Sequence, residues 1–163
     1  MIKGNGGKRI GSTFAGVSIN RDNANVTNIG DSRVYHFRNG VLKKISRDHT
    51  PIQQMIDHGV LTAETARTHP DRHTLTQHIG ISPLEMVIEP YSMYIQIEKN
   101  DMFLICSDGL TDMLDDSIIK EVIDSSDSLE VAAEALYEKS IQNGGKDNIT
   151  IVLVQIQRGG QSG

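Results

Sequence analysis

The 163-residue sequence contains no tryptophan and only one cysteine, and aromatic residues make up 4% of the chain. A single cysteine, Cys106, excludes an intramolecular disulfide and fits a reducing compartment. No apolar run approaches the length of a membrane span, and the polar, glycine-rich residues 1–9 lack the apolar stretch of a signal peptide. We therefore predict a cytoplasmic protein without a membrane span.

Basic residues are also scarce. The 16 lysines and arginines are outnumbered by 21 aspartates and glutamates, so the net charge is -5. Nucleic-acid binding needs a basic surface, and the sequence has no basic patch interleaved with aromatic residues. We therefore exclude nucleic acid as a partner. An acidic chain can still hold cations where its carboxylates converge, so the positions of the aspartates matter more than their number.

The length predicts one domain, and the hydrophobic fraction of 37% with 23% charged residues is ordinary for a globular one. Residues 1–10 and 158–163 are glycine-rich and lack periodicity, which predicts a flexible lead-in and a flexible tail. The stretch between them contains no linker and no internal repeat. We therefore predict a single folded domain over residues 11–157.

Short β-prone runs dominate this domain. They predict strands at residues 12–19, 25–29, 34–37, 41–45, 86–97, 102–106 and 149–156. Asn39-Gly40 lies between two of these runs and predicts a type I′ hairpin, because both turn positions need a positive φ. Pro90 bends the run that contains it.

Helical patterns fall in two places. Late in the chain, residues 117–123 and 128–142 predict two helices, and the second has an apolar stripe that we expect to pack on a sheet. In the middle, residues 51–58 and 62–67 predict two short helices within a polar, histidine-rich stretch from residue 50 to residue 80. We expect this stretch to be a surface excursion. The order of the elements predicts an α+β fold with antiparallel sheets.

Three aspartates share a context that suits metal binding. Asp31 and Asp108 each follow a predicted strand beside a glycine, and Asp147 precedes one. Short carboxylates held at strand ends are ligands that Mg²⁺ and Mn²⁺ require, and two such ions about 4 Å apart could clamp a phosphoryl group. The alternative is a local role, because aspartates are common in turns and at helix starts.

Five short motifs in the same order resemble the metal-dependent protein phosphatase family, the type 2C serine/threonine phosphatases, and its bacterial members in particular. The motifs are Gly11-Ser12-Thr13, Gly30-Asp31-Ser32-Arg33, Asp48-His49-Thr50, Ser107-Asp108-Gly109-Leu110 and Asp147-Asn148-Ile149-Thr150. Each is weak alone, but the ordered set is specific. The resemblance covers nearly the whole chain.

The resemblance implies a fold, a reaction and roles for residues. The fold would be an antiparallel β-sandwich flanked by helices in four layers, α/β/β/α. The reaction would be hydrolysis of phosphoserine and phosphothreonine in proteins, in which water activated by Mn²⁺ or Mg²⁺ attacks phosphorus without a phosphoenzyme. The partner would be a phosphorylated protein such as a serine/threonine kinase or its target, chosen with help from a flap at about residues 50–80.

The same resemblance assigns the site residues. Asp108 and Asp147 would be the catalytic ligands of a two-metal centre, and Asp31 would hold a third metal ion together with Asp108. Four neighbours would support these ligands: Ser32, Ser107, Gly109 and Asn148.

The sequence departs from the family before Gly11. The phosphate-binding arginine and the Asp-Gly motif that bridges the metals in the family have no counterpart there, nor do the N-terminal strands and helix. We therefore expect fewer metal ions, impaired activity and sheet edges open to association. The alternatives are a catalytically inactive pseudophosphatase that binds phosphoproteins or regulates a partner, and a phosphatase of small molecules.

Zinc is a weaker hypothesis. His69 and His73 are four residues apart, but Pro70 follows the first, and the pair lacks the glutamate of a helical H-E-x-x-H site. A structural zinc site normally has four ligands, with cysteine prominent. We therefore do not expect a zinc site built on this pair.

Overall fold

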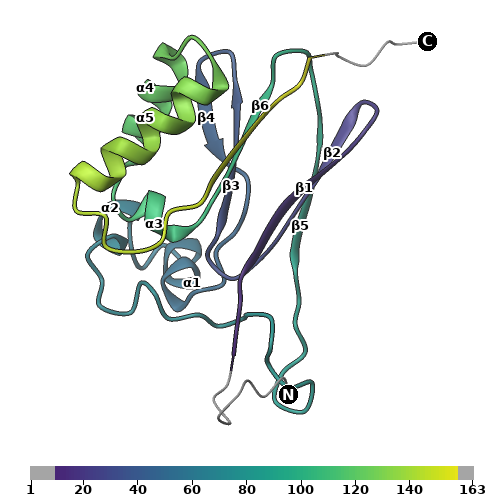
Figure 1. Ribbon diagram of the computed structural model, residues 1–163. Helices are drawn as coiled ribbons and strands as arrows, with labels where there is room; N and C mark the ends of the chain where they lie inside the picture. Colours follow the sequence, from purple (N-terminus) through teal and green to yellow (C-terminus); the bar gives the residue numbers. More distant parts are fainter. Residues whose placement is uncertain (1–9, 158–163) are drawn as a thin grey trace.

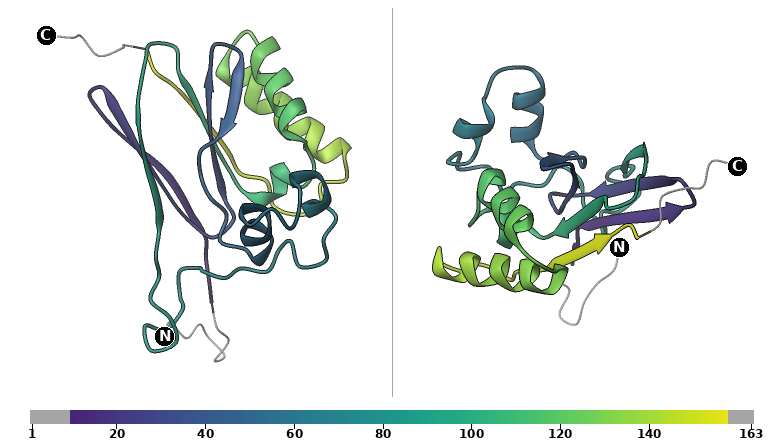
Figure 2. Two further views of the ribbon diagram at one scale, coloured as in Figure 1. Left: turned by 180° about the vertical axis from the view of Figure 1, so that it is seen from behind. Right: turned by 90° about the horizontal axis from the view of Figure 1, so that it is seen from above.

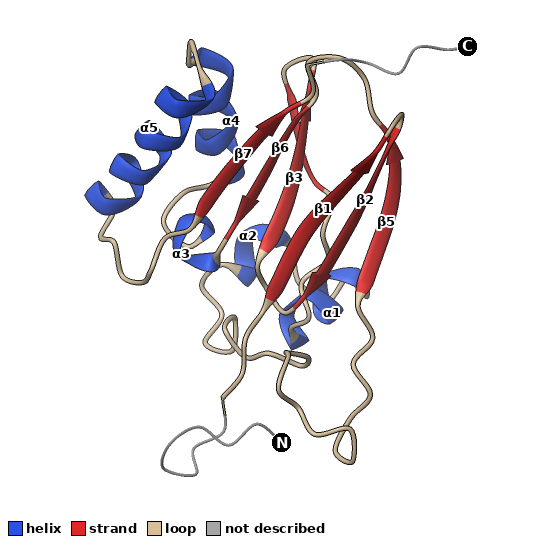
Figure 3. Cartoon of the chain, turned by 45° about the vertical axis from the view of Figure 1, so that its right-hand side comes forward, coloured by secondary structure: helices blue, strands red, loops and turns tan. Residues whose placement is uncertain are grey.

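The computed structural model describes residues 10–157, so the predictions for residues 1–9 and for the tail 158–163 lie outside the described residues. Within this range, two antiparallel sheets face each other (Figures 1 and 3). One sheet has the order β1 (Phe14–Asn20), β2 (Asn23–Ile29), β5 (Tyr91–Gln96). The other has the order β4 (Val41–Lys44), β3 (Arg33–Arg38), β6 (Met102–Cys106), β7 (Ile151–Gln155).

The turn between β3 and β4 confirms the predicted hairpin. Asn39 and Gly40 have φ values of 51° and 73°, and the strands pair in antiparallel register up to Arg38 and Val41. The predicted strand at residues 86–97 is wrong in its first part, because β5 begins only at Tyr91. Its partner β2 pairs with Tyr91 through Asn28, and the chain then turns at Gly30. Residues before Tyr91 therefore have no strand beside them, and Pro90 has no N–H to donate.

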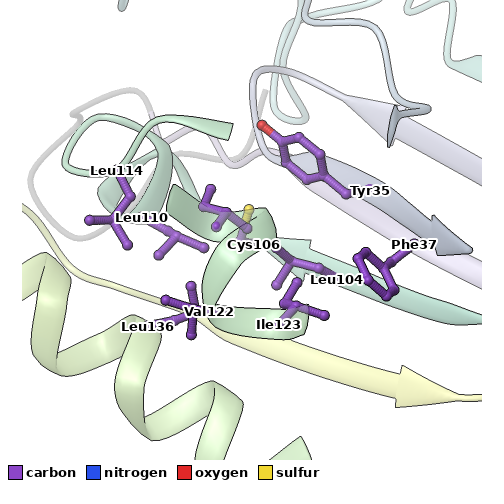
Figure 4. Close-up of a cluster of buried hydrophobic side chains, with 10 residues drawn as sticks. Tyr35, Phe37, Leu104, Cys106, Leu110, Leu114, Val122, Ile123 and Leu136 are labelled. Carbon is purple, nitrogen blue, oxygen red and sulfur yellow. The ribbon is translucent and has the colours of Figure 1, made fainter. Parts of the chain in front are cut away.

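Two hydrophobic clusters hold the layers together. Between the sheets lie buried side chains from both, including Val26, Val34 and Phe103. On the opposite face of the four-stranded sheet, Tyr35 and Leu104 pack against helices α4 (Asp116–Ser125) and α5 (Leu129–Gln142) (Figure 4). The side chains of successive residues in β3 therefore point to opposite faces of the sheet, as the two-residue repeat of a strand requires.

The predicted α+β sandwich is confirmed. Helices cover the four-stranded sheet, whereas no helix of residues 10–157 covers the outer face of the three-stranded sheet (Figures 1 and 2). The apolar stripe of α5 is buried along one edge, at Ala132 and Leu136, but Tyr137 and Ile141 remain about half exposed. Among the helices of residues 10–157, none combines the length and the hydropathy of a membrane span.

The stretch from residue 50 to residue 80, the 50–80 segment, leaves the sandwich beside one end of the sheets (Figure 2). It contains α1 (Pro51–Asp57) and α2 (Ala63–Ala66). The N-cap hydroxyl of Thr50 accepts a hydrogen bond from the Gln53 amide, and Thr62 caps α2 in the same way. A further short helix, α3 (Asp108–Thr111), directly follows β6 and was not predicted.

Candidate active site

Asp31 lies in the turn between β2 and β3. Gly30 makes this turn with a φ of 94°, and a Cβ at this position would collide with the side chain of Thr13. The buried His49 braces the turn: its Nδ1 accepts a 3.0 Å hydrogen bond from the Gly30 amide, and its own amide donates to the Gly30 carbonyl. Ser32, predicted to support the site, shares a 2.8 Å hydrogen bond with the hydroxyl of Thr13.

Asp108 is the first residue of α3, one residue after the N-cap Ser107. The Ser107 hydroxyl does not cap the helix. It accepts a hydrogen bond from the Thr150 amide and donates one to the Asn148 carbonyl, at 3.0 and 3.2 Å. Ser107 therefore ties the end of β6 to the loop that carries Asp147, which brings the two predicted ligands together.

Gly109 and Asn148 meet through the backbone. A Cβ added at Gly109 would collide with the carbonyl oxygen of Asn148, so only glycine allows the loop at residues 146–148 to lie this close to α3. The exposed Asp147 accepts a 2.7 Å hydrogen bond at Oδ1 from the Asn148 amide. Ser107, Gly109 and Asn148 thus act on the position of the loop.

The three predicted ligands interact electrostatically through Asp108. Burial and then the charge of Asp108 raise the pKa of Asp31 to about 6. Burial, followed by the charges of Asp112 and Asp147, raises the pKa of Asp108. Within residues 10–157, no ion pair involves Asp31, Asp108 or Asp147. Asp108 therefore lies near both of the other aspartates.

Asp31 and Asp108, but not Asp147, line a cleft of about 540 Å³ between the end of the four-stranded sheet and the 50–80 segment. Its floor includes Asp48, which is neutralised by Arg33 at 2.7 Å and by Lys44 at 3.3 Å. Asp31, Asp108 and Asp112 line the cleft without such a partner among the arginines and lysines of residues 10–157. The rest of the lining includes apolar and basic side chains from the segment: Ile52, Ile56, Ala66, Arg67 and Arg72.

Asp112 was missed as a candidate ligand, and His73 was considered only with His69 for a zinc site that was not expected. Asp112 lies one helical turn beyond Asp108, and the Nε2 atom of His73 is 3.4 Å from its Oδ2 atom. One ligand atom from each of His73, Asp108 and Asp112 lies within 4.8 Å of the other two. The i, i+4 spacing of the aspartates could have signalled Asp112, but only if α3 had been predicted as a helix.

The residues fit divalent cations better than covalent chemistry. Part-buried carboxylates with raised pKa values and no basic partner are stabilised by a hard cation with oxygen ligands. By contrast, burial raises the pKa of the Cys106 thiol to about 12, so this side chain is no nucleophile at neutral pH. Asp31 and Asp108 could therefore hold such ions, and the exposed Asp147 offers a further carboxylate near Asp108.

The comparisons with known proteins agree with this geometry. The family model described as Protein phosphatase 2C matches residues 65–149, just over half of the chain. The serine/threonine phosphatase stp of Listeria monocytogenes (strain F2365) is 30% identical over 146 residues, which are 90% of this chain and 57% of that protein. The serine/threonine protein phosphatase PstP of Mycobacterium tuberculosis is 32% identical over 151 residues, or 90% of this chain and 28% of that protein. The chain thus spans little more than half the length of the Listeria relative.

Solved structures show the same fold. A serine/threonine phosphatase of S. agalactiae superposes with a TM-score of 0.86 at 32% identity, over 95% of this chain and 63% of that one. The crystal structure of M. tuberculosis PstP gives a TM-score of 0.82 at 30% identity, over 91% and 61%. The catalytic domain of PstP in complex with two manganese ions gives 0.76 at 29% identity, over 90% and 59%. Together with the motifs, these matches confirm the inferred resemblance, and the chain belongs to the protein phosphatase 2C family.

Proposed function

We propose that this chain carries the metal-binding part of a phosphatase that hydrolyses phosphoserine and phosphothreonine in proteins. Asp31, Asp108 and Asp147 would hold Mn²⁺ or Mg²⁺. One observation carries the proposal: Asp31 and Asp108 line one cleft at one end of the sandwich, where the charge of Asp108 raises the pKa of Asp31 and no arginine or lysine of residues 10–157 pairs with either carboxylate. The relatives named as serine/threonine phosphatases, and the solved relative with two manganese ions, support it.

The charges of the site explain why the reaction would need cations. A phosphoserine side chain carries up to two negative charges near neutral pH and would be repelled by the carboxylates that line the cleft. Divalent ions, when bound, would neutralise these charges, polarise the phosphoryl oxygens and lower the pKa of water. The residues of this chain would position the ions through the Ser107 and Gly109 contacts described above.

The cleft supports a protein substrate. Its volume of about 540 Å³ suits a short peptide stretch, and its wall combines apolar side chains with Arg67 and Arg72. We propose that the 50–80 segment is the flap that borders the substrate, within a catalytic domain over residues 11–157. The partner would be a phosphorylated protein, including a serine/threonine kinase or its target. The single buried thiol of Cys106 supports a cytoplasmic location.

Calorimetric titration with Mn²⁺ tests the metal site directly. We expect Asp108→Ala to weaken Mn²⁺ binding at least tenfold, because this carboxylate lies beside both other ligands. The matched control is Asp124→Ala, which removes an exposed aspartate of α4 that forms an ion pair with Lys120. Equal affinities for wild type and Asp108→Ala would remove Asp108 from the metal site and end the proposal.

Hydrolysis is measured separately. The rate of phosphate release from phosphoserine and phosphothreonine peptides is compared with the rate from small phosphate esters. Faster release of phosphate from peptides supports a protein phosphatase, and the reverse order supports the small-molecule alternative. Metal-dependent binding of a phosphopeptide without any hydrolysis would favour the pseudophosphatase alternative.

A further inference from the structure

The motif Asp48-His49-Thr50 has no part in the proposed metal centre, yet its histidine contacts the turn that carries Asp31. His49 is 7% exposed and does not line the cleft. Its Nδ1 atom accepts a 3.0 Å hydrogen bond from the Gly30 amide, and its own amide donates a 2.9 Å hydrogen bond to the Gly30 carbonyl. One buried residue therefore binds both polar backbone groups of the glycine that precedes Asp31.

These two hydrogen bonds hold the peptide planes on both sides of Gly30. Each peptide unit is planar, so the Gly30 amide lies in the plane shared with Ile29, and the Gly30 carbonyl lies in the plane that contains the Cα atom of Asp31. Only φ and ψ of Gly30 rotate one plane against the other, and glycine permits a wide range of both angles. The observed φ of 94° is one of many accessible values, so the turn needs a partner outside it to keep this value.

The backbone that carries the imidazole is itself held in place. The carbonyl of His49 accepts a 2.8 Å hydrogen bond from the Thr76 amide. The fully buried Asn28 side chain donates to the carbonyl of Arg47 at 2.9 Å and to that of Gly30 at 3.3 Å. His49 therefore projects from a fixed support, as a residue that positions a neighbour must.

The hydrogen bond to Gly30 defines the form of the ring. A backbone N–H only donates, so Nδ1 must accept, and the proton of the neutral imidazole lies on Nε2. Burial, followed by the charge of Arg47, lowers the pKa of His49 and favours this neutral form. A side chain that replaces the imidazole must therefore offer an acceptor at the position of Nδ1.

We propose that His49 is a positioning residue for Asp31. By holding Gly30 on both sides, it directs the Asp31 carboxylate into the cleft that Asp108 also lines. This role rests on the proposed function, in which Asp31 holds a metal ion. His49 lies outside the cleft and acts only through the turn, as groups behind the ligands of metal sites commonly do.

Two substitutions of His49 that differ in the position of the acceptor test this role in the whole chain. Asparagine places its Oδ1 atom where Nδ1 lies in histidine, whereas the amide of glutamine lies one bond farther from the backbone. In calorimetric titration, we expect His49→Gln to bind Mn²⁺ about tenfold more weakly than wild type and His49→Asn to bind it as wild type does. The control is His58→Gln, which changes an exposed histidine and should leave the affinity unchanged.

A role in packing alone predicts a different order. Glutamine is closer to histidine in volume than asparagine is, so a side chain that only fills space would be replaced better by glutamine. The proposal is overturned if His49→Asn binds Mn²⁺ no more tightly than His49→Gln.

Amide exchange at Gly30, measured by NMR in metal-free protein, reports on the turn itself. The Gly30 amide should be protected in wild type and in His49→Asn, and it should exchange faster in His49→Gln. A Gly30 amide that is unprotected in wild type would also overturn the proposal, and this measurement needs no variant to fold.

Failure of the proposed function gives another result. If Asp108→Ala binds Mn²⁺ as wild type does, the metal centre fails, and exchange at Gly30 still decides whether His49 holds the turn. If Asp108→Ala loses affinity while His49→Asn and His49→Gln bind Mn²⁺ equally, the centre stands and His49 has no positioning role.

Discussion

Aspartates lie next to both ends of the paired strands β3 and β6, and the two ends differ in whether a basic side chain balances the negative charge. At one end, the buried Asp101 accepts hydrogen bonds from Arg38 at 2.7 and 2.6 Å and lies 3.1 Å from His36 Nε2. Although burial opposes it, the hydrogen bonds from Arg38 hold the pKa of Asp101 below its usual range. At the other end, Asp31 and Asp108 lie near each other without an arginine or lysine partner in the described part of the chain, and burial raises their pKa values.

The comparison separates a structural aspartate from ligand candidates. The negative charge of Asp101 is balanced by Arg38 of the same chain. The negative charges of Asp31 and Asp108 can instead be balanced by a bound metal cation. The stability of the chain should therefore depend on pH with opposite signs at the two ends. A lowered pKa at Asp101 contributes stability above pH 4 that is lost as the pH falls below it. A raised pKa at Asp31 lowers stability above about pH 6 in metal-free protein, and the loss disappears as the pH falls toward 4.

The largest effect is expected for Asp101→Asn. The change leaves Arg38 without its main partner at a position where Asp101 is 1% exposed, and we expect a loss of about 2–4 kcal/mol in the free energy of unfolding at pH 7. Urea denaturation measures this loss. The matched control is Glu98→Gln, which removes the 62% exposed second partner of Arg38 and should cost less than about 0.5 kcal/mol. Equal effects of the two variants would contradict a structural role for Asp101.

Gly109→Ala should come next. The added Cβ meets the backbone carbonyl of Asn148, so α3 and the loop at residues 146–148 must separate, at a cost of about 1–3 kcal/mol. We also expect weaker Mn²⁺ binding in calorimetry, because Asp108 and Asp147 move apart with them. Gly59→Asn is the control, because Gly59 has open space around it and a φ of 70° that asparagine tolerates. Unchanged Mn²⁺ affinity in Gly109→Ala would show that the loop spacing is not needed for the metal site.

Asp31→Asn should act in the opposite direction. In metal-free protein with a chelator at pH 7, we expect a gain of about 1 kcal/mol in the free energy of unfolding, a value reduced for partial exposure to water. The gain should shrink at pH 5, where the wild-type carboxyl is largely protonated. Denaturation curves at both pH values check this, and a loss of stability at pH 7 would place Asp31 with the structural aspartates.

Arg67→Ala should have the smallest effect on stability. Arg67 and Asp115 are 38% and 58% exposed, and such surface pairs contribute less than about 0.5 kcal/mol. Hydrogen exchange in residues 63–72 should nevertheless become faster, because Arg67 attaches the 50–80 segment to the α3 region. Unchanged exchange would mean that packing alone holds the segment.

Local patterns predicted much of this molecule. The Asn39-Gly40 hairpin, the buried run at residues 102–106 and the helix at residues 128–142 follow from turn chemistry and periodicity, which act over a few residues. The failures lie where neighbours distant in the chain decide. Residues 86–90 have strand-like composition but no strand to pair with, and α3 is too short for its periodicity to appear in a sequence.

The sequence by itself determined the family and the fold class, because ordered motifs and short-range preferences are written in neighbouring residues. Only the tertiary structure decided which aspartates keep an unbalanced charge. Asp48 and Asp101 are neutralised by arginines of β3, whereas Asp108 has no arginine or lysine partner among residues 10–157. The same folding brings His73 to α3. Charge balance and metal coordination depend on distances of a few ångströms between side chains, and those distances exist only once the sheets and the 50–80 segment have packed.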